Sequence, residues 1–324
     1  MADVRPNAPT ASGATLGNMA IQLPPIDPRF ILHGESHLGP WYEDWSFDLG
    51  VVIPAAILVL LYARGLDRWI ERTRPHSLWR SLSFFGGVAI AVLAVESPLD
   101  GLAERHFAFH MIQHEVLMMV AVPMILLGAP TTPVLLGLPR VLRRGVVAPL
   151  ARQSGVRAFY RGLTHPVTAL LISTAIVFAW HLVPGWYVAA LRDETLHAVQ
   201  HATFGLAAAL GWWVVIDPRP LHARLAYPPR IAFLLAASTP KAFIAAYIAF
   251  AETPLYVEWY ATVEPAFAIS LAQDQILAGM LMWLPSQLLY LLAMAVTFFV
   301  WHAAAESGDP NAPTGERALE ATPR

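Results

Sequence analysis

The chain has 324 residues, of which 56% are hydrophobic and only 14% are charged, whereas soluble domains are roughly 25% charged. The mean hydropathy is +0.50, and the apolar residues occur in long blocks, so most of the chain is expected to lie in a bilayer. A formal net charge of −2 gives no basic field to attract nucleic acid. The absence of cysteine excludes disulfides and thiolate sites, so any metal must bind His, Met, Asp or Glu.

Seven apolar stretches approach the ~20 residues that a membrane helix needs. The predicted spans are Asp48–Gly65, Ser81–Glu96, Phe107–Gly128, Pro166–Leu182, Leu196–Ile216, Arg230–Phe250 and Ala268–His302. They predict an all-α, polytopic integral membrane protein with seven transmembrane helices. Residues 48–302 form the membrane domain, between a retained extracytoplasmic tail (1–47) and a disordered cytoplasmic tail (303–324).

Arginine is concentrated in alternate connections between these spans. The first, third and fifth connections hold fourteen arginines, within residues 64–80, 140–161 and 219–230, whereas the other three hold only Arg105 and Arg192. Because basic residues remain on the cytoplasmic side of a membrane, the N-terminus is predicted outside and the C-terminus in the cytoplasm.

Six of the twelve histidines fall at the predicted outer ends of spans. They are His106, His110, His114, His181, His197 and His201. The first three recur every four residues and share one stripe of a helix, and the last two repeat that spacing. Because ionisable groups are costly in a bilayer and tend to mark function, we expect these side chains to converge in the outer leaflet.

Two imidazoles four residues apart can share a metal ion, and two such pairs on facing helices supply four nitrogen ligands. His110 with His114 and His197 with His201 are the predicted core of this site, and the other two histidines are candidate further ligands. Nearby thioethers favour cuprous copper over zinc. They belong to Met111, Met118, Met280 and Met282. The alternative is that the histidines only bond neighbouring helices or line a wet vestibule.

Polar residues near these histidines are candidates for supporting roles. Gln113, Gln200 or Asp274 are expected to orient the imidazole rings from behind. Glu115 and Lys241 each lie about nine residues from the outer end of a span, hence ~14 Å deep at ~1.5 Å per residue. Lys241 is the only lysine of the chain, and an unpaired ammonium at this depth costs ~2.5–3.5 kcal/mol. We expect Glu115 or Asp274 to neutralise it, either to orient helices or to relay protons.

The sequence offers no support for an enzyme. His114-Glu115 suggests the zinc protease motif H-E-x-x-H, but Met118 occupies the position of the second histidine. We also find no nucleotide-binding loop and no soluble domain between the spans.

Three segments carry a family resemblance: HMIQHEVLMMVAVPMILLGAP, WHLVPGWYVAALRDETLHAVQHATF and DQILAGMLMWLPSQLLYL. Together, across roughly Trp79 to Val300, they resemble the polytopic CtaG family of cytochrome c oxidase (caa-type) assembly factors. The resemblance implies a multi-pass protein of the bacterial inner (plasma) membrane that assists maturation of the oxidase and its copper centres. The family's outer histidines correspond to His110, His114, His181, His197 and His201, with Asp274 in the last helix. Glu115 departs from the apolar residue expected there.

The sequence and the resemblance together predict a non-enzymatic assembly factor that holds or delivers copper through the outer histidines, stably or in transit. Its expected partners are oxidase subunits, a periplasmic copper chaperone and membrane lipid, with no nucleic acid. Two alternatives stay open. One is a haem-binding electron carrier with two histidine ligands, and the other is a proton-coupled transporter that uses Glu115, Lys241 and Asp274.

Overall fold

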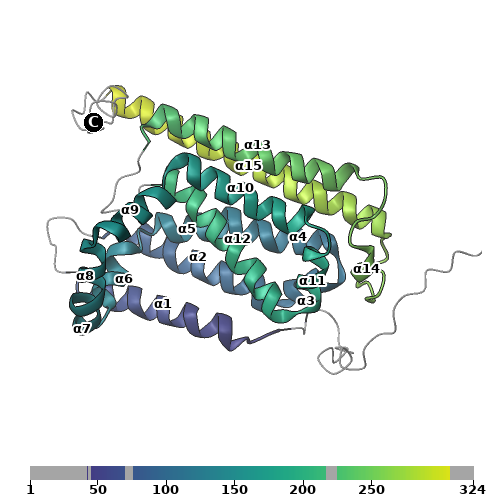
Figure 1. The fold of residues 1–324 in the computed structure, drawn as a ribbon, viewed down its shortest axis with the longest axis horizontal. Helices are drawn as coiled ribbons and strands as arrows, with labels where there is room; N and C mark the ends of the chain where they lie inside the picture. Colours follow the sequence, from purple (N-terminus) through teal and green to yellow (C-terminus); the bar gives the residue numbers. More distant parts are fainter. Residues whose placement is uncertain (1–41, 43–44, 70–75, 217–224, 307–324) are drawn as a thin grey trace, which may run out of the picture. The chain divides into compact units, whose positions relative to one another are not determined.

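The computed structural model describes residues 42, 45–69, 76–216 and 225–306. The chain divides into two units, residues 1–38 and 39–324, and only the second contains described residues. The predicted tails, 1–47 and 303–324, lie largely outside the described ranges. Within those ranges all regular structure is helical, which confirms the predicted all-α class (Figure 1).

Each of the seven predicted spans corresponds to a long helical segment. These are α1 (Leu49–Asp67), α2 (Leu78–Glu96), the continuous run of α4 (Phe107–Glu115), η3 (Val116–Ala121) and α5 (Val122–Leu127), then α10 (Pro166–Leu182), α12 (Glu194–Val215), α13 (Tyr227–Phe250) and α15 (Leu271–Glu306). Six of them are long and apolar enough to cross a membrane alone. The seventh, α10, passes the same test only together with α9 (Ser154–Leu163), from which it is bent by 64°.

Short helices connect the spans. They are α3 (Pro98–Arg105), α6 (Thr131–Gly137), α7 (Arg140–Leu142), η4 (Arg143–Val147), α8 (Ala148–Arg152), α11 (Trp186–Arg192) and α14 (Val257–Tyr260). At 36 residues and ~1.5 Å per residue, α15 is longer than the ~30 Å hydrocarbon core requires. In a bilayer of this thickness it would have to tilt or to extend beyond the hydrocarbon core.

The two ends of the helical bundle carry different residues. Helices α4, α12 and α15 begin at the same end, because Asp274 in α15 accepts the N–H of Phe107 at the start of α4, and the His197 ring in α12 lies 5.2 Å from that of His110. We call this the histidine end. The opposite end carries α6 to α9, where Arg68 donates to a backbone carbonyl of α6 at 3.1 Å, and we call it the arginine end.

The most extensive packing contact joins α13 and α15, which run side by side (Figure 1). Gly279 of α15 faces the backbone of α13, and a Cβ at this position would lie 2.5 Å from the nitrogen of Ala249. Glycine is therefore needed here for close helix approach, as small residues generally are between membrane helices.

This contact predicts a position-specific effect of adding one methyl group. Gly279→Ala should lower the thermal unfolding temperature of the detergent-solubilised protein, because overpacking costs ~1–3 kcal/mol and exceeds the ~1 kcal/mol that alanine adds to helix propensity. Gly205→Ala in α12 is the matched control, since nothing lies within 4 Å of its added Cβ, and it should leave the unfolding temperature unchanged or raise it. Equal effects of the two changes would contradict the close approach of α13 and α15.

Candidate functional site

The first turn of α4 is fixed by a carboxylate from another helix. Asp274 accepts hydrogen bonds from the backbone N–H groups of Phe107 (2.8 Å) and Ala108 (3.0 Å). These donors have no partner inside their own helix, and a negative charge at a helix N-terminus is stabilising. Asp274 thus sets where α4 begins and how it is rotated about its axis.

Two histidine pairs lie one helical turn apart on facing helices. In α4, Nε2 of His110 lies 2.9 Å from Nε2 of His114, and both residues are buried. In α12, Nε2 of His197 lies 2.8 Å from Nε2 of His201, and both residues are half-buried. Each pair is therefore within hydrogen-bond distance, which requires one ring nitrogen to donate and the other to accept.

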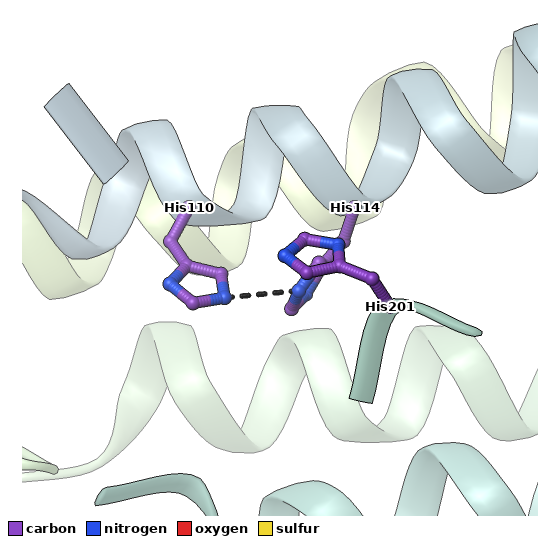
Figure 2. A group of neighbouring side chains, drawn as sticks. All are labelled: His110, His114 and His201. Carbon is purple, nitrogen blue, oxygen red and sulfur yellow. Dashed lines mark hydrogen bonds between the residues drawn. The ribbon is translucent and has the colours of Figure 1, made fainter. Parts of the chain in front are cut away.

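The two pairs meet between the helices. The rings of His114 and His201 have centroids 5.0 Å apart, and His110 lies 5.2 Å from His197. One nitrogen from each of His110, His114 and His201 lies within 4.8 Å of the others, which forms the only group of three candidate metal ligands found among the described residues (Figure 2). We call His110, His114, His197 and His201 the histidine cluster.

The histidine cluster leaves several buried ring nitrogens without partners. Nδ1 of His110, of His114 and of His201 has no hydrogen-bond partner. Gln200 is fully buried beside His110, yet its amide forms no bond of regular geometry. Because buried polar atoms are normally bonded, this concentration of unpaired atoms marks the histidine cluster as a candidate functional site.

The shared hydrogen bonds also lie close to metal-site dimensions. Two nitrogens bound to one tetrahedral ion at ~2.0 Å are about 3.3 Å apart, which is a few tenths of an ångström more than the spacing within each pair. A cation held by both Nε2 atoms would require the donor ring to carry its proton on Nδ1 instead, together with a small rotation of the rings.

His181 lies next to the histidine cluster but is bonded separately. Its Nδ1 lies 2.8 Å from the carbonyl oxygen of Val177, so this nitrogen carries the proton and Nε2 keeps its lone pair. Nε2 is buried without a partner. The residue lines a small cavity together with His114, which keeps His181 a candidate ligand.

His106 is not brought into the histidine cluster. Its Nε2 accepts the backbone N–H groups of Ala266 (2.9 Å) and Phe267 (3.1 Å), and its Nδ1 lies 3.7 Å from Asp274. Burial lowers the pKa of His106, while the Asp274 carboxylate acts in the opposite direction. His106 precedes α4 and ties this helix to the segment before α15. The Nε2 lone pair that was expected to bind metal is therefore already engaged.

The supporting roles predicted for Gln113 and Asp274 also differ from those observed. The Gln113 amide donates to the carbonyl of Ala94 at 2.9 Å and to the carboxylate of Asp100 at 2.6 Å, so it joins α4 to α2 and α3. Burial raises the pKa of Asp100 to about 6, against the opposing effect of this hydrogen bond. Neither Gln113 nor Asp274 is bonded to a ring of the histidine cluster. Their side chains instead bond groups at the ends of neighbouring helices.

Sequence reasoning missed an aromatic layer over the cluster. Tyr187 of α11 lies 5.2 Å from the His110 ring and stacks on Tyr256 at 4.0 Å. Its hydroxyl lies 3.2 Å from that of Tyr260 in α14, and burial raises its pKa well above the usual value. The sequence signal that could have located Tyr187 is its place between His181 and His197.

Glu115 and Lys241 form the predicted buried ion pair. Nζ of Lys241 lies 2.6 Å from Oε1 of Glu115, although outside regular hydrogen-bond geometry, and the hydroxyl of Ser286 donates to Oε2 of Glu115. Helices α4, α13 and α15 are therefore linked at one point. Asp274, the other candidate partner, lies in the first turn of α15 and is engaged with α4.

Replacing one member of this ion pair should lower thermal stability more than replacing both members. Lys241→Met or Glu115→Leu leaves one buried charge uncompensated, which costs ~3–5 kcal/mol, so each should strongly reduce thermal stability. The double variant should recover part of the loss. The exposed pair of His302 and Glu306, 3.6 Å apart, is the control, because removing Glu306 should cost less than ~1 kcal/mol. Strictly additive losses for the buried pair would contradict the coupling.

Comparison with known proteins identifies relatives of this chain. The chain is 24% identical over 266 residues to uncharacterised proteins of Mycobacterium bovis and Mycobacterium tuberculosis, and these alignments cover 79% of this chain and 39% of each relative. A protein of Mycobacterium leprae is 23% identical, over 81% of this chain and 40% of its own length. The chain thus spans about two fifths of the length of these relatives. No solved structure matches.

The family profile described as cytochrome c oxidase caa3 assembly factor matches residues 60–304. This range includes the whole histidine cluster, His181, and the pair of Glu115 and Lys241. The match covers well over half of the chain, and the chain belongs to the family of cytochrome c oxidase caa3 assembly factors.

Proposed function

We propose that this protein binds copper in the histidine cluster and passes it to a subunit of cytochrome c oxidase during assembly. The observation that carries the proposal is the convergence of four histidines from α4 and α12, with three candidate ligand nitrogens within 4.8 Å of one another. Family membership connects the protein with oxidase assembly, and the copper cargo is inferred from the donor atoms.

The donor set favours copper over other common cations. The group of three ligands contains only imidazole nitrogens and no carboxylate, whereas Mg²⁺ and Ca²⁺ prefer oxygen ligands. Imidazole binds copper in both oxidation states, and the absence of cysteine removes the thiolates typical of structural zinc sites.

The packing of the rings favours a single ion over haem. In a bis-histidine haem site the two imidazoles lie on opposite sides of a flat macrocycle. Here the ring centroids of the histidine cluster lie 4.3–6.1 Å apart, with hydrogen bonds within each pair. The planar slot that a macrocycle needs is not present between them.

The direction of delivery depends on the orientation in the membrane. The arginine end carries α6 to α9 with most of the described arginines, so the positive-inside rule places it in the cytoplasm. The histidine end would then face outward in a bacterial inner membrane, where a periplasmic copper chaperone and the copper-binding oxidase subunit are accessible.

This orientation can be tested with introduced cysteines, because the chain contains none of its own. Cysteine at Arg192 or Glu258, at the histidine end, should react with a membrane-impermeant thiol reagent added to intact cells. Cysteine at Arg144, at the arginine end, should react only after the cells are permeabilised. The reverse labelling pattern would contradict an outward-facing cluster.

Copper binding can be tested by removing one histidine from each pair. His114→Ala/His201→Ala should abolish stoichiometric binding of Cu²⁺ to the purified protein, because each remaining imidazole loses its neighbouring ligand. In cells the same variant should leave the oxidase catalytic subunit poor in copper and inactive. Metal analysis and the oxidase spectrum measure the two effects.

A matched control removes two histidines outside the site. His165→Ala/His302→Ala changes two exposed residues and should leave both copper binding and oxidase activity unchanged. Retention of stoichiometric Cu²⁺ by the cluster variant, or absence of copper from the unaltered protein under both reducing and oxidising conditions, would refute the proposed function.

A further inference from the structure

A second set of metal donors lies next to the histidine cluster. A small cavity is lined by His114, His181 and the side chains of Met111, Met118 and Met282. Met111 and Met118 lie on the continuous run of α4 and η3, Met282 lies on α15, and all three are buried. The cavity therefore combines thioethers from two packed helices.

The donor atoms of this cavity are neutral and available. Val177 holds the proton of His181 on Nδ1, which leaves the lone pair on the buried and unpartnered Nε2. Nδ1 of His114 is also buried without a partner. A thioether sulfur is a weak hydrogen-bond acceptor, so the methionines lose little solvation when they are buried.

The charges around the cavity balance. Lys241 and Glu115 both line it, and their 2.6 Å ion pair leaves no net charge beside the donor atoms. A bound monovalent cation therefore meets no net repulsion, and the Glu115 carboxylate is already engaged by Lys241 and Ser286.

We propose that this cavity is a second copper site, selective for the cuprous ion, with ligands from His181 and from the thioethers of Met111, Met118 and Met282. Soft thioether and imidazole donors without thiolate select Cu(I) over Zn²⁺ and Cu²⁺. The proposal rests on the proposed function, since the ion enters through the histidine cluster.

His114 connects the two sites. It is bonded to His110 within the histidine cluster and also lines the cavity. An ion can thus exchange ligands one at a time between the cluster and the cavity. The copper stays cuprous throughout, so the transfer needs no oxidant or reductant.

Methionine also fills irregular gaps in apolar cores, so the test must detect copper–sulfur bonds directly. The purified full-length protein is loaded with Cu(I) under anaerobic conditions, and its copper content and X-ray absorption at the copper edge are measured. The expected result is two copper ions per chain, with both nitrogen and sulfur scatterers.

The matched variants exchange methionine for leucine, a swap of similar volume. Met111→Leu/Met118→Leu/Met282→Leu should lose the sulfur scattering and reduce the copper content from two ions to one. Met119→Leu/Met280→Leu/Met294→Leu changes three methionines that do not line the small cavity and should keep two copper ions and the sulfur signal.

A measurement on the protein without substitutions tests the second site even if the triple variant misfolds. In protein labelled with selenomethionine, copper bound by these side chains should show selenium as a neighbouring scatterer. Copper with only nitrogen neighbours, or full copper content and unchanged scattering in the first triple variant, overturns the second site and leaves the proposed function intact. If the unaltered protein binds no copper at all, both fail.

Discussion

The carboxylate of Asp274 holds the first turn of α4 against α15, and the position of the histidine cluster depends on this contact. The start of a helix exposes N–H groups that cannot be left unpaired in a buried place. Asp274 accepts two of them, from Phe107 and Ala108, and so fixes the rotation of α4 as well as its height. Because His110 and His114 follow within the next two turns, this rotation directs both rings toward α12.

The wide turn η3 has a comparable effect on the next residues. Pro123 in α5 has no N–H, so the regular bond to the preceding turn cannot form, and the backbone widens between Val116 and Ala121. A carbonyl left free by this widening, that of Met118, accepts the indole N–H of Trp212 at 3.1 Å. π turns are frequent at functional sites, and this one begins directly after Glu115 and brings Met118 to the cavity.

The fold class, the spans and the convergence of His110, His114, His197 and His201 could be predicted from sequence because they depend on periodicity and on the cost of polar groups in lipid. The pairing of Glu115 with Lys241 followed from their matched depth. The roles of His106 and Asp274 could not be predicted. Spacing along the chain shows which residues share one face of a helix, but not which side chains of other helices contact that face. The same limit hid Tyr187, whose α11 is too short to have a span signature.

The histidine cluster combines features that suit temporary binding. Four neutral imidazoles held in two hydrogen-bonded pairs are already close to ligand spacing, so little ordering is needed when an ion binds. Without an ion, the hydrogen bond within each pair keeps both Nε2 atoms partnered, and this bond forms again when the ion leaves. Uptake and release would therefore need only a shift of one ring proton from Nε2 to Nδ1 in each pair, without movement of the helices that the buried ion pair and Asp274 hold together.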